Sequence, residues 1–158
     1  MKPWLLSLAL LVASPALAQT NINLGGITTD PGAPVEVAAD SLSVDQDTGT
    51  AVFEGNVVIG QGQLRIAAGR AQVVYDGTTG DIASFDASGG VTFANGTEAA
   101  EAQSATYNLQ TGELILEGDV LLTQGASALA ADRMVIDVNT GNARMDGRVR
   151  TVFQQGAN

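Results

Sequence analysis

Carboxylates are the main chemically reactive side chains of this sequence, which contains no histidine and no cysteine. Its one lysine, Lys2, lies at the extreme N-terminus. An ordinary nucleophile–base pair, a Schiff base and a histidine/cysteine metal site are therefore excluded from the body of the chain. Two acids facing one cleft could still hydrolyse a glycosidic bond. We keep a carboxylate-dependent, glycan-processing β-helix as the least favoured function.

The positions of the acids argue against such a cleft. Most lie in expected turns, as Asp45 and Asp76 do, or on outward strand positions, as Glu54 and Glu117 do. The segment 45–49 begins like a calcium loop but lacks the glutamate that would complete the coordination. We therefore expect no enzyme activity, no metal site and no cofactor.

A fourfold repeat determines how the chain is organised. The dipeptide Thr-Gly recurs at glycine intervals of 31, 32 and 29 residues. Its glycines are Gly49, Gly80, Gly112 and Gly141. In three copies another glycine follows six positions later, at Gly55, Gly118 and Gly147. Similarity at a fixed period indicates one supersecondary unit that is stacked several times.

Each unit reads as a strand, a tight turn and a bent strand. Apolar and polar residues alternate with period two around every Thr-Gly, and independent copies choose the same face. The Thr-Gly glycines suit hairpin turns, and the later glycines suit bulges at which a long strand bends. In the second copy, Gly89 and Gly90 replace the single later glycine. We interpret the alanine-rich stretch 99–105 as a loop that leads into a strand.

The inward face of these strands is the candidate binding surface. Stacked strands of this kind can close into a jelly roll, a β-helix or a barrel. The interior is then either a packed core or a groove for acyl chains, and periodicity cannot distinguish the two. The candidate lipid-binding residues are Leu42, Val44, Phe53, Val57, Ile59, Leu64, Ile66, Val73, Tyr75, Phe85, Phe93, Tyr107, Leu114, Leu116, Val120, Leu122, Met134 and Ile136.

The N-terminus predicts export. Lys2 precedes a short apolar stretch, 4–12, and residues 16–18 form an A-x-A site, so we expect a signal peptide over 1–18 that is cleaved after Ala18. No cysteine lies near this site, which excludes a lipid anchor. We expect a periplasmic protein with a flexible arm over 19–34, one domain over 35–153 and a short tail over 154–158.

The charge of the mature chain limits its partners. Six arginines stand against 17 acidic residues, a net charge of −11. Binding to a phosphate backbone needs clustered positive charge, so nucleic acid is excluded as a partner. The acidity itself is typical of a soluble exported protein.

One stretch carries a resemblance to a known family. Residues 38–59 read A-A-D-S-L-x-V-D-x-x-T-G-x-A-x-F-x-G-N-V-V-I, and Leu116 to Val120 form a matching L-x-G-x-V strand. This pattern resembles the periplasmic lipopolysaccharide-transport proteins of the LptA/OstA-like family, and the similarity extends from Val35 to about Phe153. The resemblance implies an all-β fold: a slightly twisted, open β-jelly roll of stacked antiparallel strands, here with repeats of about 30 residues.

The resemblance also implies a function. Family members carry lipopolysaccharide from an inner-membrane complex to an outer-membrane translocon and assemble head to tail through exposed edge strands. The implied partners are lipopolysaccharide, bound by its lipid A acyl chains, the inner- and outer-membrane transport proteins, and further copies of this chain. With no lysine in the mature chain, contacts to lipid A phosphates would rest on Arg65, Arg70 and Arg133. The alternative is a structural β-solenoid that polymerises end to end without lipid.

Overall fold

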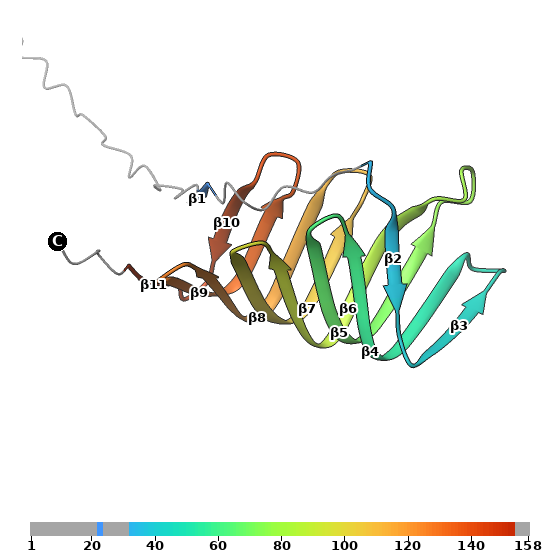
Figure 1. The fold of residues 1–158 in the computed structure, drawn as a ribbon, viewed down its shortest axis with the longest axis horizontal. Coiled ribbons are helices and arrows are strands. Elements are labelled where there is room, and N and C mark those ends of the chain that lie inside the picture. Colours follow the sequence, from blue (N-terminus) through green and yellow to red (C-terminus); the bar gives the residue numbers. More distant parts are fainter. Residues whose placement is uncertain (1–21, 24–31, 154–158) are drawn as a thin grey trace, which may run out of the picture.

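The computed structural model describes residues 22–23 and 32–153, and the predicted signal peptide, most of the predicted arm and the tail lie outside this range. The described residues form eleven strands in one antiparallel sheet (Figure 1). In chain order they are β1 (Ile22–Asn23), β2 (Val35–Ala38), β3 (Ser41–Asp45), β4 (Thr50–Gln61), β5 (Leu64–Tyr75), β6 (Ile82–Asn95), β7 (Glu98–Asn108), β8 (Glu113–Gln124), β9 (Ser127–Asp137), β10 (Asn142–Asp146) and β11 (Arg150–Val152).

Neighbouring strands follow one another along the chain from β4 to β9, and the two ends of the sheet are split. Both β2 and β3 pair with β4, whereas both β10 and β11 pair with β9. The split occurs because every long strand bends in the middle and so belongs to two arms of the folded sheet. This is the predicted jelly-roll architecture, and the predicted fold class is confirmed.

The bends are β-bulges at the later glycines of the repeat. The registers of β4 with β5 and of β8 with β9 shift at 55–56 and 118–119. Gly55 and Gly118 have φ angles of 80° and 83°, values that only glycine adopts without strain. The second copy bends at Gly89 and Gly90, as the sequence indicated.

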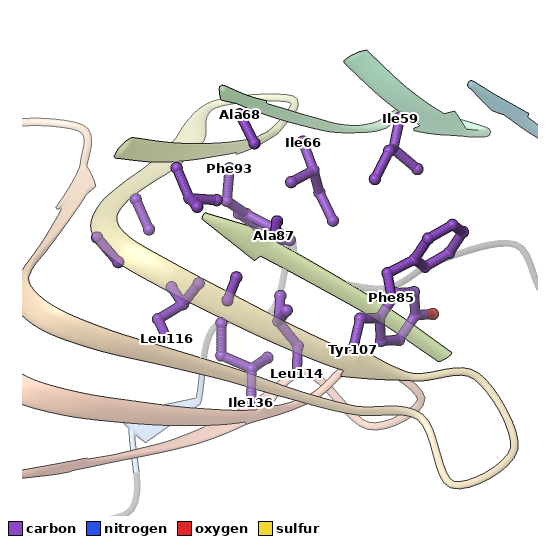
Figure 2. Packing of buried hydrophobic residues seen from close by; sticks show 14 of the residues in the cluster. Ile59, Ile66, Ala68, Phe85, Ala87, Phe93, Tyr107, Leu114, Leu116 and Ile136 are labelled. Carbon is purple, nitrogen blue, oxygen red and sulfur yellow. The ribbon is translucent and has the colours of Figure 1, made fainter. Parts of the chain in front are cut away.

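The bends divide the sheet into two arms. Arm A carries the Thr-Gly turns and comprises 41–54, 70–88, 104–117 and 133–146. Arm B carries the short hairpins and comprises 35–38, 57–68, 91–102, 120–131 and 150–152. The inner faces of both arms bury one hydrophobic cluster, and Figure 2 shows Ile59, Ile66 and Phe93 of arm B pointing into the space that Leu114 and Leu116 of arm A also enter.

The turns of arm A repeat one hydrogen-bond pattern. The Asp45 carboxylate accepts from the backbone N–H groups of Asp47 and Thr48, at 2.9 and 3.2 Å. Asp76, Asn108 and Asp137 accept from the corresponding amides of their own turns. These side chains are Asx-type turn residues, so three of the acids in turns have a structural role.

One secondary-structure prediction was wrong. The stretch 99–105 is not a loop, because it lies inside the continuous strand β7. Its alanines at 100, 102 and 105 are buried in the core, where small side chains fill the narrow space between the arms. The alanine content therefore reflects packing space and does not mark a break in the strand.

Candidate functional site

The interior of the folded sheet is the candidate functional site, and its lining residues are arranged in cross-strand rows. Residues paired across antiparallel strands share one face, so each row runs along the roll from strand to strand. One row of arm A comprises Val44, Ala51, Val73, Phe85, Tyr107, Leu114, Ile136 and Ala143. One row of arm B comprises Val37, Ile59, Ile66, Phe93, Ala100, Leu122 and Leu129.

Through the middle of the roll these rows form a closed core. Leu114, Leu122, Met134 and Ile136 are each 0% exposed. The rings of Phe85 and Tyr107 stack with their centroids 6.2 Å apart. The apolar inner faces of the two arms therefore pack against each other. A lipid that binds in the middle of the roll would have to separate the two arms.

The predicted inward positions are buried along most of this interior. Phe53 is half-buried, and the structure buries Val57, Ile59, Leu64, Ile66, Val73, Phe85, Phe93, Tyr107, Leu114, Leu116, Val120, Leu122, Met134 and Ile136. The inward orientation of these residues is confirmed. Their contact with lipid remains a prediction.

Three predicted interior residues are not buried. Leu42 and Val44 are 56% and 59% exposed, although their partners Phe53 and Ala51 show that they face the interior side of the sheet. The reason is their position: β3 is an end strand that pairs only with β4 among the described residues. The interior is thus open to solvent at the β3 end.

Tyr75 is the third of these residues, with 38% exposure. It is the last residue of β5, and the register between β5 and β6 shifts between Val74 and Tyr75. Tyr75 is therefore not part of the closed core, and its contact with lipid remains a prediction.

The structure adds a polar row that the sequence analysis missed, consisting of Gln61, Asn95, Glu98 and Gln124. Each lies on the inner face of arm B, two positions from an apolar core residue and next to a hairpin. Asn95 and Glu98 are only 2% and 3% exposed. Continuing the period-two pattern from Ile59 to Gln61 and from Ala100 to Glu98 would have located them.

The three candidate phosphate-binding arginines lie on the outer face. Arg65 donates from Nη1 to the backbone carbonyls of Gly62 and Leu64, at 2.7 and 2.8 Å. Arg70 and Arg133 pair with Glu54 and Glu117 at 3.4 and 3.2 Å. The structure does not bring the three together, so their role towards phosphate stays a prediction.

The described acids do not form a cluster that could bind a metal ion. In the part of the chain that the structure describes, no three acidic side chains are placed to hold a metal ion. The pKa of Asp76 lies below its ordinary value because the backbone N–H groups of Thr78 and Thr79 donate to its carboxylate. That carboxylate therefore stabilises its own turn.

The two ends of the roll expose apolar side chains and strand edges. At the β3 end the exposed apolar residues are Leu42 and Val44. At the β11 end they are Val149, Val152 and Phe153, which are 49%, 62% and 72% exposed. β1 adds two residues to β10 at that end. None of the described residues forms a helix that could cross a membrane.

Comparisons with known proteins agree with this geometry. A family model described as LptA/(LptD N-terminal domain) LPS transport protein matches residues 36–142. An uncharacterized protein of Rhizobium meliloti (strain 1021) is 30% identical over 154 residues, which cover 90% of this chain and 83% of that protein.

Two further relatives carry descriptive names. The lipopolysaccharide export system protein LptA of Escherichia coli (strain K12) is 35% identical over 72 residues, which span 46% of this chain and 38% of LptA. The crystal structure of LptH from Pseudomonas aeruginosa, the LptA-homologous periplasmic component of a lipopolysaccharide transport device, superposes with a TM-score of 0.73 at 19% identity. It covers 80% of this chain and 99% of LptH, and it shows that the fold is shared.

Proposed function

Because this chain belongs to the LptA/(LptD N-terminal domain) family of LPS transport proteins, we propose that it binds lipopolysaccharide and passes it between the membranes as one segment of a protein bridge. The acyl chains lie among the inward side chains of the two arms, and the acidic outer face stays in water. The family is one of transport proteins and not an enzyme class. The proposed location is the periplasm, reached by cleavage of the signal peptide after Ala18.

The observation that carries this proposal is an apolar interior that continues into exposed side chains at one end. The row that begins at the exposed Val44 runs through Ala51, Val73 and Phe85 into the closed core. An acyl chain can bind first at the open end and then separate the arms along the row. Burial of its apolar surface contributes roughly 25 cal/mol per Å², less the cost of displacing arm-to-arm contacts.

Assembly of the bridge would use the split ends of the sheet. At one end β2 and β3, and at the other β11, present backbone edges that pair with no further strand among the described residues. An exposed edge invites pairing with a strand of another chain, and stacking of this kind would join the interiors of successive rolls. The proposed partners are the inner- and outer-membrane transport proteins and further copies of this chain.

Photocrosslinking of lipopolysaccharide tests the proposal. A photoreactive amino acid is placed at inward positions Phe53, Leu116 and Ile136, and at outward Glu54 as the control. We expect adducts at the inward positions, strongest at Phe53 near the open end, and none at Glu54. Absence of adducts at all inward positions, with circular dichroism showing a folded protein, would refute lipid transport.

The closed packing of the middle strands favours one alternative, a scaffold that polymerises without cargo. In that case the arms never separate, and the inward side chains serve only as core. Filament length measured by sedimentation with and without lipopolysaccharide, together with the crosslinking result, separates the two functions. A scaffold assembles equally in both conditions and forms no inward adducts.

A further inference from the structure

The polar row defined above occupies a particular place in the interior. It is the last inner row of arm B before the hairpins at 62–63, 96–97 and 125–126. Gln61 pairs with Leu64, Leu64 with Asn95, Asn95 with Glu98, and Glu98 with Gln124. The next row towards the bend is wholly apolar and runs parallel to the polar row, so a lipid whose acyl chains pack against that apolar row lies beside the polar row.

Two acceptor atoms of this row are buried and have no hydrogen-bond partner in the part of the chain that the structure describes. Gln124 donates from Nε2 to Glu98 Oε1 at 2.6 Å, and Gln61 donates from Nε2 to the Ala33 carbonyl at 3.3 Å. Among the described residues, Glu98 Oε2 and Gln61 Oε1 have no hydrogen-bond partner, although the two residues are only 3% and 7% exposed. None of the ion pairs formed by the described residues includes Glu98.

An unpaired buried carboxylate oxygen is costly, and most buried polar atoms in proteins have a partner. Folding alone does not require a carboxylate in this row, since the same row holds a buried apolar residue, Leu64, on β5. Acceptors held ready beside an apolar row are instead suited to a ligand that supplies donors.

We propose that the polar row is a hydrogen-bond-accepting site for the part of a lipid where acyl chains join the head group. The ligand class is a lipid with hydroxyl or amide N–H donors at that junction, such as an N-acylated, hydroxylated amino sugar. Lipids whose acyl chains are joined only by esters have hydrogen-bond acceptors at that junction. These acceptors cannot form hydrogen bonds with the acceptor atoms of the polar row. Phosphate is repelled by the Glu98 carboxylate and lies outside this row. This inference rests on the proposed function and specifies which lipids the interior selects.

The test compares Glu98→Gln with Glu101→Gln on the same strand. Glu98→Gln keeps the size of the side chain and one oxygen for Gln124 but replaces the unpaired acceptor with a donor. Glu101 is exposed on the outer face, so Glu101→Gln removes the same charge without touching the interior. Dissociation constants are measured for lipopolysaccharide, for ceramide and for dioleoylphosphatidylcholine, which has no donors at its acyl junction.

We expect Glu98→Gln to weaken lipopolysaccharide binding about tenfold, the size of one hydrogen bond to a charged group. Dioleoylphosphatidylcholine binding stays unchanged, and Glu101→Gln binds all three lipids like the wild type. If ceramide affinity falls in parallel, the row recognises donors at the acyl junction of lipids in general. If only lipopolysaccharide affinity falls, the row recognises the acylated sugar. Gln61→Leu, which removes the other unpaired acceptor, should repeat the loss.

Other results would overturn the proposal. An unchanged affinity of Glu98→Gln for lipopolysaccharide would show that the ligand does not reach the row. Equal losses for lipopolysaccharide and dioleoylphosphatidylcholine would show that the substitution alters the shape of the interior. If the wild type binds none of the lipids, the proposed function fails and this inference fails with it.

Discussion

The bends of the sheet are built in two different ways, which we compare as clasped corners and a glycine corner. At a clasped corner, a residue with a left-handed backbone conformation follows the bulge glycine. Its side chain forms a hydrogen bond with a polar side chain of the neighbouring segment. Asn56 donates from Nδ2 to Asp40 at 2.9 Å, with φ at 46°. Gln103 donates to Asp119, and Arg148 donates to Asp132, in the corresponding positions.

The glycine corner lies between β5 and β6 and has no such side chains. Gly69 stands where Asp40, Gln103 and Asp132 stand in the other copies, and Gly89 and Gly90 form the bulge. A Cβ on Gly89 would lie 3.3 Å from the Gly69 Cα, so the two backbones approach closely. The comparison shows that this fold needs a bend in every unit but does not prescribe how the bend is held.

The largest expected effect compares alanine substitutions at the two corner types, at glycines that have nearly equal φ angles. Gly118 and Gly90 have φ angles of 83° and 81°, but a Cβ would lie 2.8 Å from the Gln103 Cβ at the first and meet nothing within 4 Å at the second. We expect Gly90→Ala to cost about 1–2 kcal/mol from backbone strain, and Gly118→Ala about 3 kcal/mol because the overlap adds to that strain. Urea unfolding midpoints measure both. Equal losses would show that the clasp does not constrain the corner.

A smaller effect is expected when a clasped corner is converted into a glycine corner. Asn56→Gly removes the hydrogen bond to Asp40 and makes the unfolded chain more flexible. Relief of the left-handed strain offsets part of this cost, so we expect a net loss of at most about 1 kcal/mol in the free energy of unfolding. Asp40→Ala should cost a similar amount alone and much less in the Asn56→Gly background. Additive losses in the double variant would show that the two side chains do not interact.

The smallest effect concerns pH dependence at the last clasped corner. Hydrogen bonds from Arg148 hold the pKa of Asp132 below its ordinary value, and the positive charge of Arg148 lowers it further. Desolvation acts in the opposite direction but is outweighed. A carboxyl group whose pKa is lowered by folding stabilises the folded protein at pH values above its unfolded-state pKa. This stabilisation disappears as the pH falls through the folded-state pKa.

We therefore expect the difference in unfolding free energy between wild type and Asp132→Asn to be constant near neutral pH and to shrink only in acid. The Arg148→Ala variant serves as the control, because in its background the lowered pKa and this acid-dependent difference both disappear. A difference that already shrinks between pH 7 and pH 6 would contradict the assignment to Asp132.

The inward face of the roll was predictable because period-two alternation is local and was repeated in independent copies. Phe85, Leu116 and Ile136 could each be assigned from their distance to a Thr-Gly turn. The alanine stretch in β7 was not predictable in this way, since small residues resemble loop residues until the opposing arm is known. Residue spacing also indicated every bulge but not the partner that holds it.

The sequence by itself determined the all-β class, the repeat, the bends and the face of each strand, because turn chemistry and alternation act over a few residues. Only the tertiary structure decided which inward residues are buried. Leu42 and Leu116 follow the same alternation, but one lies on an end strand and the other between two neighbours. It also decided that Glu98 is buried beside Gln124, because burial depends on strands that are brought together only when the sheet folds over its own core.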